Sequence, residues 1–97
     1  MAVFLILCTD VPASGALRAE HREAHLKHVR SSGRTRLAGP ILDDAEAVAG
    51  SFLLIEAACK EDAQSWSAAD PFRRAGVYAD VEIRPVRLTY KALESDG

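Results

Sequence analysis

The chain has 97 residues and a formal net charge of −2, from 12 basic and 14 acidic side chains. This length suits one domain, and basic residues spread evenly along it argue against a nucleic-acid-binding surface. No stretch approaches the roughly 20 apolar residues that a membrane span needs. We therefore expect neither a nucleic-acid partner nor a membrane.

The two cysteines, Cys8 and Cys59, form neither a disulfide framework nor a CxxC pair. Each ends an apolar run, where a buried reduced thiol is the common case, so both are predicted to be buried and free in a reducing cytoplasm. The apolar opening of the chain is short, lacks a basic flank and is followed by Asp10. These features predict a strand and not a signal peptide.

The first predicted element is a strand over 2–9, a continuous Val, Phe, Leu and Ile run typical of a central strand covered on both faces. A helix is predicted next, over about 16–31. Ser14 or Gly15 can cap its start, and Gly33 is placed to end it in a left-handed conformation.

The middle of the chain predicts two further strands. The first is short, over 34–38, and Gly39-Pro40 is expected to close it and to begin a connection through 41–46. The second, over about 49–57, is apolar almost throughout and is again predicted to be central.

The last third predicts a helix over 60–69, which Pro71 stops, and a turn or short helix over 72–77. The strand that follows, within 80–90, changes its apolar phase at Pro85. A phase change at a proline indicates a bulge or an edge position.

The predicted order is β-α-β-β-α-β in a single domain over 1–97, with 91–97 as a frayed tail. Two right-handed βαβ halves give a ferredoxin-like α+β fold, a four-stranded antiparallel sheet with two helices on one face. The strands over 2–9 and 49–57 are apolar on both faces. The helix-free face therefore needs a cover, and a second copy in a homodimer is the simplest one.

The helix over about 16–31 contains all three histidines, and a helical wheel places His21, His25 and His28 on one arc. A helix that turns titratable groups toward its own fold either lines a cleft or satisfies them inside. His25 is a candidate general base, although a hydrogen-bonded core histidine is commoner. No acidic residue or cysteine completes a metal site with His21 and His25, so no metal or other cofactor is expected. The opposite arc is charged: Glu20, Glu23, Lys27 and Arg30.

Asp70 allows two interpretations. Asp followed by Pro71 is a common N-cap and first-turn pair of a short helix, which is the interpretation that the residues alone favour. The alternative is a carboxylate that accepts a hydrogen bond from an imidazole and fixes its tautomer.

Arg18 and Arg22 share a helical stripe with His25. They form either a solvated edge of weak ion pairs or a cationic wall for an anionic or enolate-like substrate oxygen. Asp10, at the end of the first strand, is a natural partner for one of them. Phe72 is most simply a core or interface residue.

Several segments together are similar to the YciI-like family of small single-domain proteins, and the resemblance covers almost the whole chain. It implies a ferredoxin-like fold related to the dimeric α/β barrels. It also implies a functional pair of a histidine on the first helix and an aspartate before Pro-Phe, which fall on His25 and Asp70. Some relatives are linked to the degradation of chlorinated aromatics. The segments are Cys8-Thr9-Asp10 with Pro12, Arg18…Arg22-Glu23-Ala24-His25-Leu26, Leu37-Ala38-Gly39-Pro40, Gly50-Ser51-Phe52, Ala68-Ala69-Asp70-Pro71-Phe72, and Ala75-Gly76-Val77-Tyr78 before Val81-Glu82-Ile83-Arg84-Pro85.

Two functions of different classes follow. The first is a cofactor-independent lyase or isomerase, in which His25 moves a proton on a small oxygenated substrate, such as one derived from a chlorinated aromatic, and Asp70 orients His25. The second is a non-catalytic small-ligand-binding or accessory domain that uses the same cleft. A pH profile set by His25 separates catalysis from binding. The candidate substrate-binding residues are Arg18, Arg22, Asp10, Gly39, Pro40 and Phe72.

Overall fold

The computed structural model of the protein describes residues 1–91. The tail predicted over 91–97 therefore lies outside the described residues, apart from Lys91. The order of the elements is the predicted one, with a short helix where a turn or short helix was expected. The elements are β1 (Ala2–Asp10), α1 (Gly15–Ser31), β2 (Thr35–Leu42), β3 (Val48–Ala57), α2 (Lys60–Ala68), α3 (Pro71–Arg74) and β4 (Tyr78–Val86).

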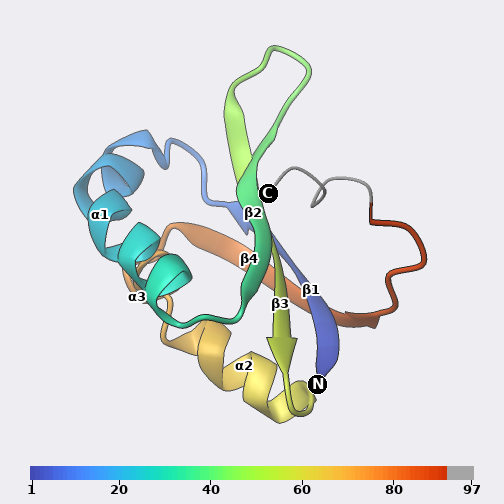
Figure 1. Ribbon diagram of the computed structural model, residues 1–97. Helices are drawn as coiled ribbons and strands as arrows, with labels where there is room; N and C mark the ends of the chain where they lie inside the picture. Colours follow the sequence, from blue (N-terminus) through green and yellow to red (C-terminus); the bar gives the residue numbers. More distant parts are fainter. Residues whose placement is uncertain (92–97) are drawn as a thin grey trace.

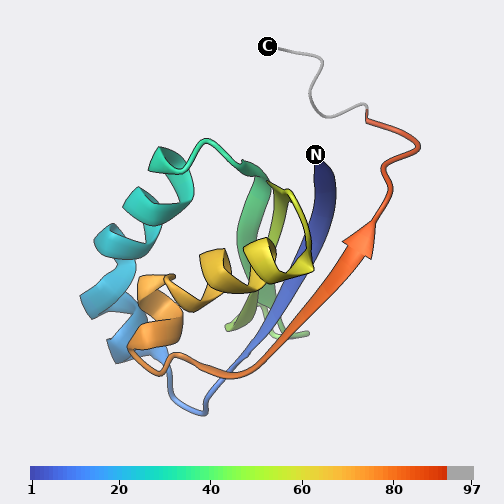
Figure 2. The same cartoon turned by 90° about the horizontal axis from the view of Figure 1, so that it is seen from below.

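The four strands form one antiparallel sheet in the order β2-β3-β1-β4. The two strands with continuous apolar runs, β1 and β3, are the central ones, as predicted. The three helices cover one face of the sheet, and no described element covers the other (Figures 1 and 2). The ferredoxin-like α+β prediction is confirmed.

The prediction that Gly39-Pro40 closes the second strand is wrong, because β2 continues through both residues to Leu42. Pro40 pairs with Ser51 of β3. The strand tolerates this proline because β2 lies at the edge of the sheet, where a missing N–H is least disruptive. The extra length of β2 places Gly39 and Pro40 beside helix α1 and not in a remote turn.

The proline in β4 also lies in an edge strand, which was one of the two predicted alternatives. The other alternative, a bulge at Pro85, is absent, because Pro85 stays in register opposite Phe4. The register shift between β1 and β4 falls instead at Thr9 and Asp10. It lies at the end of the sheet where Asp10 enters the candidate site.

The core lies between the sheet and the helices. Alternate residues of β1 point into it, and Cys8 is one of them, only 2% exposed. Cys59, which was predicted to be buried, is exposed. The physical reason is that β3 ends at Ala57, so Cys59 lies beyond the strand, at the N-cap position of α2. Both thiols are free, as predicted.

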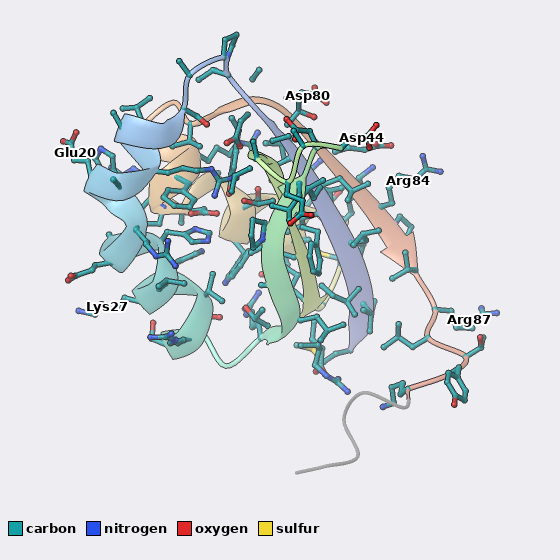
Figure 3. All side chains as sticks on the ribbon, turned by 90° about the horizontal axis from the view of Figure 1, so that it is seen from above. Glu20, Lys27, Asp44, Asp80, Arg84 and Arg87 are labelled. Atoms are coloured by element: carbon teal, nitrogen blue, oxygen red, sulfur yellow. The ribbon has the colours of Figure 1, made fainter. Side chains whose placement is uncertain are left out.

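Helix α1 turns a narrower face toward the domain than the helical wheel predicted. His25 is the buried residue of this helix, whereas Arg22, assigned to the inner arc, is exposed. Glu20 and Lys27, on the predicted outer arc, point away from the body of the domain (Figure 3). Gly33 follows the helix with a φ of +71°, the left-handed conformation predicted for it.

The helix-free face of the sheet is largely apolar in its centre. Leu5 and Leu7 of β1 point to this face, because they alternate with the core residues of that strand, and both are half-buried. Leu5 pairs with Leu54 and Leu7 pairs with Phe52 on β3. Among the helices of residues 1–91, none is both long and apolar enough to cross a membrane.

Candidate active site

A cavity of about 360 Å³ separates helix α1 from strands β2 and β3. The sheet contributes residues such as Ser51 and Leu53, and α3 contributes Phe72. Two predicted site residues, Asp10 and Asp70, do not line the cavity but bind side chains that do. The six that line it are Arg18, Arg22, His25, Gly39, Pro40 and Phe72.

The predicted contact between His25 and Asp70 is present, with 2.7 Å between Nδ1 of the imidazole and Oδ1 of the carboxylate. Asp70 is 2% exposed and His25 is 8% exposed. The same Oδ1 also accepts a hydrogen bond from the backbone N–H of Phe72, at 2.9 Å, which makes Asp70 the N-cap of α3. The cap and the histidine partner were treated as alternatives, and the one carboxylate is both.

This contact determines which nitrogen of His25 carries the proton when the imidazole is neutral. An ionised carboxylate only accepts hydrogen bonds, so Nδ1 must donate to Asp70. The lone pair is then on Nε2 of a residue that lines the cavity. The pair therefore has the arrangement of a general base with a carboxylate partner.

The ring of Phe72 fixes the plane of the imidazole. His25 stacks on Phe72 with a centroid distance of 4.0 Å and an interplanar angle of 10°. The Arg18 guanidinium carbon lies 5.0 Å from the centroid of the same ring, and Tyr78 meets the ring edge at 6.2 Å. Because Pro71 and Asp70 hold α3 in place, Phe72 is a fixed platform for the imidazole of His25 and the guanidinium of Arg18.

Asp10 binds Arg18, as the sequence suggested for one of the two arginines. The Arg18 guanidinium donates two hydrogen bonds to the Asp10 carboxylate in a bidentate ion pair, with Nε 2.6 Å from Oδ2 and Nη2 2.9 Å from Oδ1. Ser14, which occupies the N-cap position of α1, donates to Asp10 at 2.6 Å instead of capping the helix. Burial alone would raise the pKa of Asp10, but the bonds from Arg18 and Ser14 outweigh it and hold that pKa below its ordinary value.

The sequence interpretation did not place Ser51 or Tyr78 in the candidate site. Nη2 of Arg18 reaches the carbonyl oxygen of Gly50 at 2.9 Å and Oγ of Ser51 at 2.8 Å. The Tyr78 hydroxyl donates to the same Oγ at 3.0 Å, and burial raises the pKa of Tyr78. The available signal was a lone hydroxyl within an apolar central strand, since a buried polar side chain needs partners.

The other two histidines lie outside the cavity. His21 lies 3.6 Å from the Glu20 carboxylate at the surface. His28 places Nε2 3.0 Å from the Trp66 carbonyl and packs against the indole, so it links α1 to α2. Within residues 1–91, no three His, Cys, Asp or Glu side chains gather as metal ligands would.

Together the fold and the site define a small ferredoxin-like α+β domain with a buried His–Asp pair beside a helix–sheet cavity. The model of the YCII-related domain matches residues 2–87, and the chain therefore belongs to the YCII-related family.

Two curated relatives support the assignment to this family. An uncharacterised protein of Haemophilus influenzae is 33% identical over 96 residues, which cover 90% of this chain and 98% of the relative. Protein YciI of Escherichia coli is 32% identical over 97 residues, which cover 91% of this chain and 99% of the relative.

A solved structure with the same fold carries a bound small molecule. It is the 5-chloro-2-hydroxyhydroquinone dehydrochlorinase TftG of Burkholderia phenoliruptrix, in complex with 2,5-dihydroxybenzoquinone. It superimposes with a TM-score of 0.78 at 30% sequence identity, and the alignment covers 88% of this chain and 93% of the other.

Proposed function

We propose that the protein is a cofactor-independent lyase or isomerase that transfers a proton on a small, oxygenated cyclic substrate. His25 is the general base, and Asp70 orients it and stabilises the imidazolium that forms. Arg18 binds the substrate oxygen on which negative charge develops, and Arg22 adds positive charge at the exposed side of the cavity. The proposed cellular location of the protein is the cytoplasm.

The observation that carries this proposal is the 2.7 Å contact between Nδ1 of His25 and Oδ1 of Asp70 beside the cavity. Both side chains are buried, and burying titratable groups is costly unless they are paired. The helix cap needs only the backbone bond from Phe72, so it does not account for the histidine at Asp70. A general base paired in this way typically contributes about 10²- to 10⁴-fold to a rate.

The arrangement of the arginines supports a substrate with anionic or carbonyl oxygens. Arg18 is held rigidly by Asp10, so little conformational entropy is lost when it binds a ligand oxygen. Arg22 lines the same cavity and, in the part of the chain that the structure describes, has no ion-pair partner. Its charge is thus available to an anionic substrate.

The name of the Burkholderia relative supports elimination of HCl as one reaction to test. In that reaction His25 takes a proton from the ring or from a hydroxyl of the substrate. The chloride leaves with its bonding electron pair, and the net products are the dechlorinated ring and HCl. No redox step is required, so proton transfer and charge stabilisation are sufficient for the reaction.

Chloride release from 5-chloro-2-hydroxyhydroquinone tests the proposal. We expect turnover by the unaltered protein. His25→Ala should abolish turnover. The matched control is His21→Ala, which removes an imidazole from the same helix outside the cavity and should retain turnover. Ligand binding without turnover would favour the non-catalytic alternative.

We further propose that the protein is a homodimer whose interface covers the helix-free face of the sheet. Leu5, Leu7, Phe52 and Leu54 meet there, and an apolar surface of this kind favours association with a partner. A two-fold interface brings the same face of each copy together.

A further inference from the structure

We propose that Ser51 is a ligand-binding residue, whose hydroxyl acts with Nη1 of Arg18 as a pair of hydrogen-bond donors for an oxygen of the ligand. The assignment rests on the proposed function and names the chemical group that this part of the cavity recognises. That group is a carbonyl, enolate or phenolate oxygen, which accepts two hydrogen bonds.

The hydrogen bonds around Ser51 leave its own hydrogen unused. Oγ accepts one hydrogen bond from Nη2 of Arg18 and one from the hydroxyl of Tyr78, at 2.8 and 3.0 Å. These two donors fill the two lone pairs of the hydroxyl oxygen. Within residues 1–91, no acceptor takes the remaining hydrogen of Ser51. Ser51 is 4% exposed and lines the cavity, so a ligand there is in a position to supply the acceptor.

Arg18 is also only partly satisfied. Its Nε and Nη2 atoms bind Asp10, Gly50 and Ser51. No acceptor among the described residues binds Nη1. Nη1 of Arg18 thus has unused hydrogens, and its guanidinium contacts the Ser51 hydroxyl, which also has an unused hydrogen. Both residues line the same cavity.

This arrangement selects among ligands. An oxygen acceptor satisfies both donors at once, whereas an apolar ring edge or an ammonium group leaves the buried Ser51 hydroxyl and the half-buried Arg18 without acceptors. Hydrogen bonds from a charged donor are stronger than those between neutral groups, so an anionic oxygen gains most. The pair therefore favours the deprotonated form of a phenolic or enolic ligand.

Tyr78 is a positioning residue in this scheme, because its bond to Ser51 occupies a lone pair and turns the serine hydrogen toward the cavity. In this scheme its hydroxyl acts on the ligand through Ser51. Its effect should therefore vanish when the Ser51 hydroxyl is absent, which a double-mutant cycle measures.

The probe is 2,5-dihydroxybenzoquinone, with binding measured by titration calorimetry. Ser51→Ala is expected to raise its Kd about 10-fold or more, the effect of losing one hydrogen bond to a charged oxygen. Ser51→Cys, which keeps the size with a weaker donor, should raise Kd similarly and covers a failure of the alanine variant to fold. The matched control is Ser67→Ala, a buried serine of α2 outside the cavity, which should change Kd by less than about twofold.

Tyr78→Phe should raise Kd about threefold when Ser51 is present and should add nothing to Ser51→Ala. Equal binding by the protein with and without the Ser51 hydroxyl overturns the assignment. Additive effects of the two substitutions overturn the positioning role of Tyr78. Failure of the unaltered protein to bind the quinone overturns the ligand class and this assignment together. The proposed catalysis is judged separately, by chloride release in the His25 variant.

Discussion

Gly50 of β3 passes so close to the carbonyl oxygen of Cys8 in β1 that no β-carbon fits between them. The carbonyl of Gly50 itself accepts a hydrogen bond from Arg18 at 2.9 Å. The close approach of the two central strands therefore also positions the Gly50 carbonyl oxygen that accepts the hydrogen bond from Arg18.

We predict that Gly50→Ala destabilises the fold by about 2 kcal/mol or more, because the new methyl group meets backbone and not a movable side chain. In a domain of this size that loss lowers Tm by roughly 10 °C. Thermal unfolding followed by circular dichroism measures it. Gly15→Ala is the control, since nothing lies within 4 Å of a β-carbon there, and its effect should stay within about 0.5 kcal/mol.

Asp70→Asn separates the two roles of this side chain. Asparagine is as good an N-cap as aspartate, so α3 and the fold should persist with little change in Tm. It has no charge to stabilise the imidazolium of His25, and its amide can present the wrong partner to Nδ1. We expect kcat for chloride release to fall about 100-fold or more. A variant with wild-type kcat would contradict the proposed role of Asp70.

The stability of the protein should fall in acid partly because of Asp10. The folded state holds the pKa of Asp10 below its ordinary value of 3.8, so the unfolded chain takes up the proton first as pH falls. The stabilisation is therefore complete above about pH 4 and is lost below it. Asp10→Asn should lower the free energy of unfolding by about 2 kcal/mol at pH 7 and should weaken its fall with decreasing pH. Urea unfolding at a series of pH values measures both effects. The control is Asp44→Asn, on the exposed β2–β3 loop, which should change neither the free energy of unfolding at pH 7 nor its pH dependence.

The two thiols should react very differently. Burial raises the pKa of Cys8 to about 12, so little thiolate is present at pH 8, and the side chain is inaccessible as well. Cys59 is exposed. A bulky aromatic disulfide reagent should label one thiol quickly in the native protein and the second only on unfolding. Cys59→Ser should remove the fast phase, and rapid labelling of that variant would show that Cys8 is accessible.

The proposed dimer should sediment at twice the 10.5 kDa of the chain at micromolar concentration. Leu5→Lys places a charge in the centre of the helix-free face and should yield monomers that retain their circular dichroism spectrum. Glu20→Lys changes the charge on the outer side of α1 and should leave the dimer intact (Figure 3). Monomeric unaltered protein would contradict the proposal.

The strand order could be predicted from the sequence because the two uninterrupted apolar runs had to be the central strands. The end of β2 could not, since Gly39-Pro40 has the composition of a turn and only its place at the sheet edge makes the proline acceptable. The burial of Cys59 was mispredicted for a similar reason: the apolar run extends past the end of the strand.

The candidate site was predictable where one residue type has a clear chemical partner. A pairing of Asp10 with one of Arg18 and Arg22 followed from their charges and positions, but that the partner is Arg18 comes from the structure. The dual role of Asp70 did not, because composition cannot show that one oxygen accepts two hydrogen bonds. Ser51 was hidden by its apolar neighbours in β3, and its role depends on a tyrosine from another strand.

Two side chains of the candidate site, His25 and Arg18, help to attach helix α1 to the domain. His25 binds Asp70, Arg18 binds Asp10, and His28 binds the backbone of α2. The free energy of local opening of residues 15–31 therefore depends on the same contacts that orient the proposed base. A ligand that engages Arg18 and His25 adds to these contacts and should slow amide hydrogen exchange along the helix. Substrate affinity and the rigidity of α1 are thus thermodynamically linked.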